Sequence, residues 1–252
     1  MGTSGAFGGS GAWSGTVDSL YDAAAAFNIS PTAPLPLAVM STLGKSLSRG
    51  DKHGKSYKVQ DLLRRSRGEG SSSSGDGRDS GGATFARQAA RGSLVLDALA
   101  SIEVGDVPHL VEYGVDFSSL EGLSGVRLFT EIIALVLGPA SHPDDAALQQ
   151  SLLATMRSKE QSADASLADT VGRFVTELAW QTTRVQLSAS ERRVSVVRSA
   201  LVQLEQKVRT YIGGKVKQIA GQLVNATPQA VADFASSLAA KACRVFGEGD
   251  SA

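Results

Sequence analysis

The sequence predicts an all-α fold, in which a helical bundle follows a flexible Gly/Ser-rich N-terminal tail and a flexible Gly/Ser-rich linker. Three observations lead to this prediction. Apolar residues recur every three or four positions through most of residues 84–247, helix-start and helix-stop residues separate these segments, and no segment alternates with a period of two for the length of a strand. We therefore expect one helical domain over residues 84–247, with 248–252 as a C-terminal tail.

The composition is that of an ordinary globular protein. The 252 residues are 42% hydrophobic and include 25 basic and 25 acidic side chains, so the whole molecule has no long-range attraction for nucleic acid or anionic membrane. Cys243 is the only cysteine, which excludes an intramolecular disulfide and fits a reducing compartment. Because the first residues lack the basic and apolar regions of a secretion signal, we predict a cytoplasmic protein.

The N-terminal region is predicted to be a tail followed by one helix. Residues 1–15 contain six glycines and few large side chains, which is typical of a disordered tail. A first helix is expected from about Thr16 to Phe27, before three prolines force an extended path. Its inward face would consist of Val17, Leu20, Tyr21, Ala24 and Phe27.

The stretch from Lys45 to Arg67, within residues 16–67, is strongly basic, with eight Lys or Arg and two Asp. It allows two interpretations, a solvated basic face or a contact with phosphates or nucleic acid. We expect little specific nucleic-acid binding, because Tyr57 is the one obvious residue on which a base could stack. The candidates for phosphate contact are Lys58, Arg64, Arg65 and Arg67.

Residues 68–83 divide the chain, since eleven of the sixteen are Gly or Ser, the composition of a flexible linker. Beyond this linker, a short helical turn is expected at Val107–Tyr113. It follows a longer helix whose inward face would consist of Phe85, Ala89, Leu96, Leu99 and Ile102.

The most apolar stretch is Val126–Leu137, which would be apolar around nearly its whole circumference as a helix. Such a helix is expected at the centre of the bundle, with the other helices packed around it. Ser118 and Glu121 have the spacing of a capping box before it, and Gly138 with the following proline supplies a stop. At twelve residues it is too short to cross a membrane, which requires about twenty.

Two further helices are predicted after that stop. The first begins at Pro143 with two acids in its first turn, and its inward residues are Leu148, Leu152 and Met156. The second carries an inward stripe of Leu167, Val171, Phe174 and Leu178. Trp180 lies off this stripe, which leaves two interpretations, an exposed anchor for a partner or a second packing face.

The last two helices are a heptad segment and a C-terminal helix. A second capping box at Ser188 and Glu191 precedes a series that alternates steps of three and four until Gly213-Gly214. This series is Val194, Val197, Leu201, Leu204, Val208 and Tyr211. It fits either a contact inside the bundle or a self-association surface. The final helix is expected to begin at Thr227-Pro228, to end at Gly247 and to bury Val231, Phe234, Leu238 and Val245.

The sequence carries no recognisable catalytic or metal-binding motif, so we predict a non-enzymatic protein without a cofactor. His53, His109 and His142 lie in unrelated segments at spacings unlike those of metal ligands. Cys243 could act as a nucleophile beside a histidine, but a lone helical cysteine more often only packs. The acids that fall near apolar faces, Glu131 and Glu177, are expected at helix surfaces or in ion pairs.

The start of the chain has a chemical feature of its own. A small residue after Met1 permits removal of the methionine, and Gly2 would then present an unhindered amine whose pKa of about 8 makes it a usable nucleophile. N-myristoylation requires Ser or Thr at position six, where this chain has Ala6. Two interpretations remain, a disordered start of no consequence and a leader presented to a modifying enzyme.

Three segments together resemble a known family. They are Met1–Ser4 within a Gly/Ser-rich start, the hinge Ser80–Ala83 before a helix, and Gly114–Leu123 before the apolar helix. In this order they are similar to the QatB family, a component of the bacterial Qat anti-phage defence system. The resemblance covers roughly the first 140 residues, while the C-terminal half is similar only in being helical.

The resemblance implies an adaptor that acts in an anti-phage complex with three partners: an ATPase (QatA-type), a QueC-like enzyme (QatC-type) and a TatD-like nuclease (QatD-type). It also implies that the QueC-like enzyme attaches a deazaguanine-type nucleobase to the N-terminal amine, which here is that of Gly2. The recognition context would be Thr3, Ser4 and Gly5. The alternative is a helical oligomerising scaffold or nucleic-acid-binding module that uses residues 45–67 and the heptad helix at 190–212.

Overall fold

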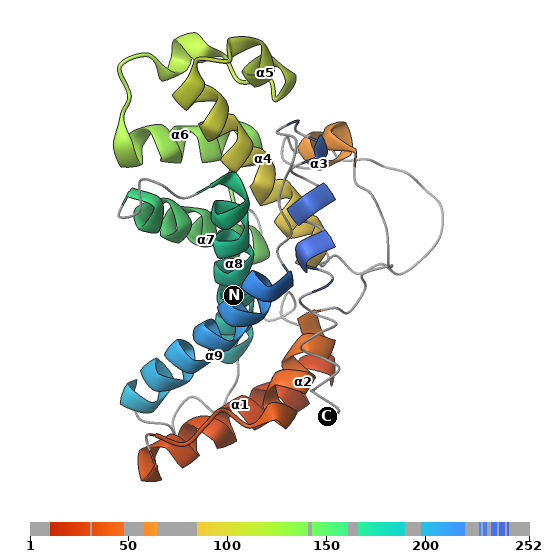
Figure 1. The fold of residues 1–252 in the computed structure, drawn as a ribbon, viewed down its shortest axis with the longest axis vertical. Coiled ribbons are helices and arrows are strands. Elements are labelled where there is room, and N and C mark those ends of the chain that lie inside the picture. Colours follow the sequence, from red (N-terminus) through yellow and green to blue (C-terminus); the bar gives the residue numbers. More distant parts are fainter. Residues whose placement is uncertain are drawn as a thin grey trace, which may run out of the picture.

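The structure is a computed structural model, and most of the residues that it describes are helical (Figure 1). It describes residues 11–30, 32–47, 58–64, 85–140, 143–160, 166–189, 198–219, 227, 229–230, 233–235, 237–239 and 241. None of these residues lies in a strand, which confirms the all-α prediction. The predicted linker at 68–83 and the first ten residues of the predicted tail lie outside the described residues.

Helix α1 spans Gly11–Ile29 and begins inside the segment predicted to be a tail, so the expected start at Thr16 was wrong. The glycines there disfavour a helix, but Trp13 packs against the core and tertiary packing outweighs the local propensity. The inward face is as predicted, because all five of its residues are buried.

Two helices that the sequence analysis missed lie in or beside the basic stretch. α2 spans Leu37–Leu47 and α3 spans Val59–Arg64. The apolar period of α2 is short and is framed by prolines on one side and charges on the other, which masked it in the sequence. α2 buries Val39, Met40, Leu43 and Leu47, and α3 buries Leu62.

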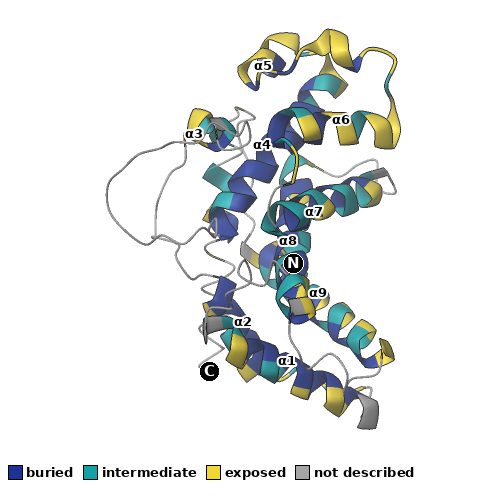
Figure 2. Cartoon of the chain, turned by 180° about the vertical axis from the view of Figure 1, so that it is seen from behind, coloured by how far each residue is buried: buried dark blue, intermediate teal, exposed yellow. Residues whose placement is uncertain are grey.

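The centre of the molecule is formed by α4, Phe85–Val104, and α8, Leu167–Ala189. α8 contacts α1, α4, α7 and α9, and most of α4 is buried, as the dark blue of Figure 2 shows. The stripes predicted for both helices are correct, with Ile102 and Leu167 half-buried at their ends and the other residues buried.

The helix predicted to be central is instead peripheral. α6, Gly125–Leu137, packs against α4 and α7 at one end of the molecule, and Val126, Thr130 and Ala134 are exposed (Figures 1 and 2). The prediction was wrong because apolar side chains on all sides do not determine how many neighbours a helix has. Small residues in α4, such as Ala90 and Gly92, allow closer approach of other helices.

Between α4 and α6 lie α5, Val107–Glu112, as predicted, and a 3₁₀ turn, η2, Phe117–Leu120. The capping box expected at Ser118 and Glu121 is not formed. Asp116 caps η2 instead, because its carboxylate accepts the Ser118 amide at 3.0 Å and the Ser118 hydroxyl at 2.8 Å. These two hydrogen bonds, chiefly the one from the hydroxyl, lower the pKa of Asp116.

Both ends of α6 are marked by backbone features. It begins after Ser124, and it ends where the Gly138 N–H donates to the Ala134 carbonyl. Gly138 has a φ of 74°, which favours glycine, so the predicted stop is correct.

The C-terminal half contributes α7, Pro143–Glu160, and α9, Arg198–Ile219. α7 begins at the predicted proline and buries its three predicted residues. α9 packs on α8 and α1, so its apolar face makes contacts inside the bundle. That face consists of Ala200, Leu204, Val208, Ile212 and Val216, with Leu201 and Tyr211 half-buried beside it.

Two predicted boundaries around α9 were wrong. α9 continues through Gly213-Gly214, because the buried Ile212 and Val216 hold it on its neighbours across the glycines. Ser188 lies in the last turn of α8, where its hydroxyl donates to the Val185 carbonyl, so it does not start a new helix. Val194 and Val197 lie outside the described residues.

The described residues after α9 agree with a final helix. The Ala230 N–H donates to Thr227 Oγ1 at 3.3 Å, as at a helix start, and residues 229–230, 233–235, 237–239 and 241 are helical. Leu238 is buried and Phe234 is half-buried. Val231, Val245 and the predicted end at Gly247 lie outside the described residues.

The helices before and after residues 68–83 share one hydrophobic core. The Tyr21 hydroxyl of α1 donates to the Leu187 carbonyl of α8 at 2.9 Å, and Lys207 of α9 donates to the Ala33 carbonyl. The division that we predicted at this linker therefore does not separate two cores in the described parts of the chain. Within those parts, no helix combines the length and apolar character needed to cross a membrane.

Candidate functional site

The residues predicted to carry function fall mainly outside the described part of the chain. Gly2, Thr3, Ser4 and Gly5 lie there, as do Arg65 and Arg67. Arg64 is the last residue of α3, and its side chain is likewise not described. Lys58 immediately precedes α3 and is exposed, as expected of a residue on a solvated basic face.

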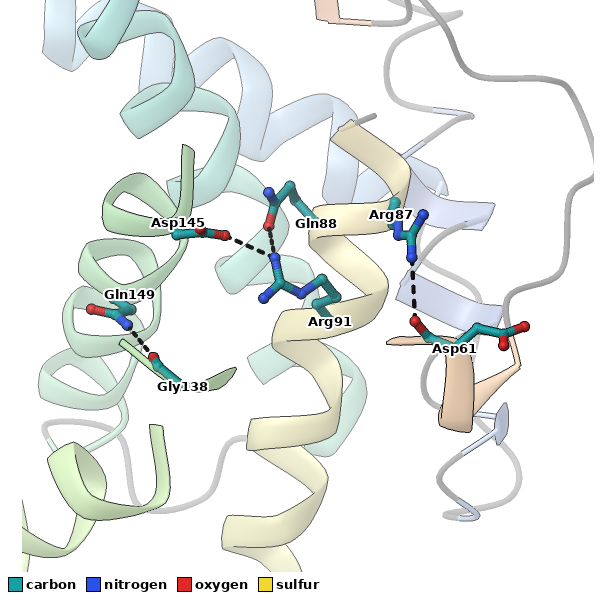
Figure 3. Close-up of polar contacts among 7 residues, drawn as sticks. All are labelled: Asp61, Arg87, Gln88, Arg91, Gly138, Asp145 and Gln149. Atoms are coloured by element: carbon teal, nitrogen blue, oxygen red, sulfur yellow. Dashed lines mark hydrogen bonds and ion pairs between the residues drawn. The ribbon is translucent and has the colours of Figure 1, made fainter. Parts of the chain in front are cut away.

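The part of the basic stretch that forms α3 is held against α4. Arg87 of α4 donates from Nη2 to the Asp61 carbonyl of α3 at 3.2 Å, as Figure 3 shows. Leu62 next to it is buried in the core. These contacts fix the position of α3. The exposed Lys58 directly precedes its first residue.

A buried arginine joins α4 to α7. Arg91 donates from Nη1 to Asp145 Oδ1 at 2.9 Å and to Gln88 Oε1 at 3.4 Å (Figure 3). Asp145 lies in the first turn of α7, where the helix dipole also favours a negative charge. Gln149 donates to the Gly138 carbonyl at 3.0 Å, which ties α7 to the end of α6. Arg91 Nε is buried without a hydrogen-bond partner, but Nη1 is paired with Asp145 and the contacts join α4, α6 and α7, so we interpret the cluster as structural.

A second charged cluster lies between α8 and α9. Arg209 donates from Nη2 to Glu177 at 2.8 Å, pairs through Nη1 with Glu205 at 2.9 Å, and has its guanidinium carbon 5.9 Å from the centre of the Trp180 ring. Trp180 is only 3% exposed, so it forms a second packing face and is not an exposed anchor. Glu177 is paired, as expected, and Glu131 is exposed on α6.

The Glu177 carboxyl should make stability depend on pH. Burial raises its pKa above the ordinary value of 4.5, and the charge of Arg209 offsets only part of that effect. The Glu177 carboxyl therefore stays protonated to a higher pH in the folded state than in the unfolded chain. The stability that this carboxyl contributes is fully present below pH 4.5 and falls as pH rises through the raised pKa.

Glu177→Gln removes this titration while Glu205 still pairs with Arg209. We expect the free energy of unfolding of the parent protein, relative to Glu177→Gln, to decrease as pH rises over that window. Urea unfolding at several pH values measures the difference. A difference that increases with pH would contradict the expected sign.

A buried tyrosine–aspartate pair was not anticipated from the sequence. Tyr113 donates its hydroxyl to Asp97 Oδ2 at 2.5 Å, and both side chains are buried. Burial, followed by the charge of Asp97, raises the pKa of Tyr113. The pair connects the middle of α4 to the turn after α5. The sequence feature that could have revealed this pair is Asp97, the single acid in the otherwise apolar run of residues 94–99.

Among the described residues, no group of three or more His, Cys, Asp or Glu is arranged to hold a metal ion. His109 lies in α5 with its side chain not described, and His53, His142 and Cys243 lie outside the described residues. Comparison of the chain with models of protein families, with curated proteins and with solved structures gave no match. The resemblance to the QatB family therefore enters below as a proposal.

Proposed function

We propose that this protein is a non-enzymatic component of an anti-phage defence complex of the Qat type, in which it acts as an adaptor and is itself modified at Gly2. One observation carries the proposal, the Met-Gly-Thr-Ser start followed by a Gly- and Ser-rich leader. It is a feature of the sequence, and it coincides with the start that the family resemblance identifies. Within the resemblance, the modifying enzyme is the QueC-like partner and the group is a deazaguanine-type nucleobase.

The chemistry requires an accessible amine on a residue without a hindering side chain. Gly2 meets this requirement once Met1 is removed, and near neutral pH part of its amine is unprotonated. Thr3, Ser4 and Gly5 would supply the residues next to the amine that the enzyme reads. The ATPase and the TatD-like nuclease would be the other members of the complex.

On this proposal, the length of the leader bounds the distance from α1 at which the partner enzyme acts. α1 begins at Gly11, and the Thr16 hydroxyl bonds the Ser46 hydroxyl at 2.9 Å and the Thr42 carbonyl at 3.2 Å, which fixes α1 against α2. Nine residues span at most about 30 Å when fully extended. The active site of the modifying enzyme must therefore lie within about 30 Å of the start of α1 when it acts.

Gly2→Pro should abolish both the modification and the defence, because a secondary amine within a ring is hindered and conformationally locked. Gly2→Ala should weaken the reaction without eliminating it. Intact mass spectrometry of protein purified from cells that carry the whole gene cluster measures the modification, and phage challenge of the same cells measures defence. The melting temperature should be unchanged in both variants, since the substitution precedes every described helix.

An unmodified mass for the parent protein, together with full protection by Gly2→Pro, would leave the leader without a role and remove the mechanism from the proposal. Gly15→Ala is a matched control near the leader. Gly15 lies in α1, and no atom within 4 Å would meet the added methyl group. This variant should be modified and should protect like the parent protein.

A further inference from the structure

One end of the molecule exposes an unusual number of apolar side chains. Seven large hydrophobic side chains are exposed among the described residues, and five of them belong to residues 104–126, which we name the apolar cap. These five are Val104, Val107, Val111, Phe117 and Val126. They come from the end of α4, from α5, from η2 and from the start of α6, which lie together at one end of the molecule (Figures 1 and 2). Single exposed apolar residues are ordinary, but a concentration in one region marks an interaction site.

Helix α5 is apolar on both its inward and its outward sides. Leu110 of α5 and the adjacent Tyr113 are fully buried, which accounts for the inward side. Val107 and Val111 are one helical turn apart and therefore share a face, and Val111 is 65% exposed. A short surface helix that binds no partner normally has polar residues on its outward face. Val104, 79% exposed, is the last residue of α4 and precedes the start of α5 by three positions.

The apolar cap lies in an acidic part of a neutral molecule. Residues 103–131 contain six carboxylates and one guanidinium, a formal charge of −5, whereas the whole chain has a charge of zero. Lys159 pairs with one of the six, Glu103, at 2.6 Å. Glu112, Glu121 and Glu131 are exposed on α5, after η2 and on α6. The exposed valines therefore share this acidic segment with exposed carboxylates.

We propose that the apolar cap binds a basic amphipathic helix of a partner protein. An apolar stripe flanked by Lys and Arg complements exposed valines in an acidic segment, both in its apolar contact and in its charge. A second copy of the cap is a poor occupant, because two surfaces of the same negative charge would face each other. Nucleic acid and anionic membrane are repelled for the same reason. The proposal rests on exposure and charge in residues 103–131 and is independent of any modification of Gly2.

The test uses the full-length protein and a synthetic helical peptide of about four turns, with Leu along one face and Lys along the other. We expect saturable binding that weakens with added salt, measured by fluorescence anisotropy of the labelled peptide. The same peptide with Glu in place of Lys should bind at least about tenfold more weakly.

Variants of the protein locate the binding site. Val104→Ser combined with Val111→Ser should weaken binding about tenfold or more. Glu112→Gln combined with Glu121→Gln should weaken it and reduce its dependence on salt. Val202→Ser is the matched control, because Val202 is a 56% exposed valine on α9, outside the cap, and it should leave the affinity within about twofold. All five side chains are exposed, so the melting temperature should not change.

Three results would overturn the proposal. The first is equal binding of the Lys and Glu peptides. The second is peptide affinity that is unchanged in the double valine variant. The third is self-association of the parent protein, seen by analytical ultracentrifugation and lost in the double valine variant, which would assign the apolar cap to a second copy of the chain.

Discussion

Substituting Ile132 by aspartate should lower the free energy of unfolding by several kcal/mol and leave α6 unable to pack. Ile132 is fully buried in α6, which lies against α4 and α7. The change removes an apolar side chain whose truncation alone costs about 2–5 kcal/mol, and it adds a charge that requires water or a partner. Since whole domains are stable by about 5–15 kcal/mol, much of the protein should be unfolded at 37 °C.

Two variants of the same helix control for this result. Thr130→Asp places the same charge on the exposed face and should change stability by less than about 0.5 kcal/mol. Ile132→Val keeps the site apolar and should cost about 0.5–1.5 kcal/mol. Urea unfolding followed by circular dichroism measures all three variants. An Ile132→Asp variant with the parent melting temperature would show that the inward face of α6 is not packed in solution.

Gly92→Ala should destabilise the protein even though alanine is the better helix former. A Cβ at Gly92 would lie 2.0 Å from Phe174 Cζ and 2.7 Å from Cε1, because α4 and α8 approach each other closely there. The ring or the helix has to move, and such overpacking costs about 1–3 kcal/mol or more, against a gain of about 1 kcal/mol from helix propensity. Because the 2.0 Å approach is far inside van der Waals distance, we expect a cost of about 2–3 kcal/mol and hence a net loss of about 1–2 kcal/mol. This loss should lower the melting temperature by about 2–8 °C in a protein of this size.

Gly214→Ala is the matched control for Gly92→Ala and should act in the opposite direction. Gly214 lies inside α9, and no atom within 4 Å would meet an added methyl group. This substitution should therefore raise stability by about 0.5–1 kcal/mol. The double variant Gly92→Ala, Phe174→Leu should lose less stability than the sum of the losses of the two single variants, because the smaller side chain vacates the clashing space. Equal shifts for the two alanine variants would contradict the close approach of α4 and α8.

The sequence by itself determined the fold class and most of the inward faces. The stripe of Val171, Phe174 and Leu178 in α8 and the start of α7 at Pro143 were both correct. These features are local, because a 3.6-residue period and a proline in the first turn act within a few residues of the chain. The predicted site residues Gly2, Arg65 and Arg67 lie outside the described residues, so their roles stay predictions.

Local signals failed where a stronger local cap or a contact from elsewhere in the chain competed with them. The capping-box spacing of Ser118 and Glu121 was overridden by Asp116, whose carboxylate takes the Ser118 amide first. Gly213-Gly214 did not stop α9, because buried residues on both sides hold the helix against its neighbours. In each case the pattern was present, but a stronger local cap or tertiary packing decided the outcome.

Only the tertiary structure decided which helix is central and which surface is left uncovered. α6 is the most apolar helix but lies at one end, whereas α4 is buried because small residues such as Gly92 admit Phe174 of α8 at close range. The burial of Asp97 with Tyr113 and the exposure of Val111 likewise depend on where other helices lie. Burial and exposure depend on neighbours brought together from distant parts of the chain, and a one-dimensional pattern does not specify those neighbours.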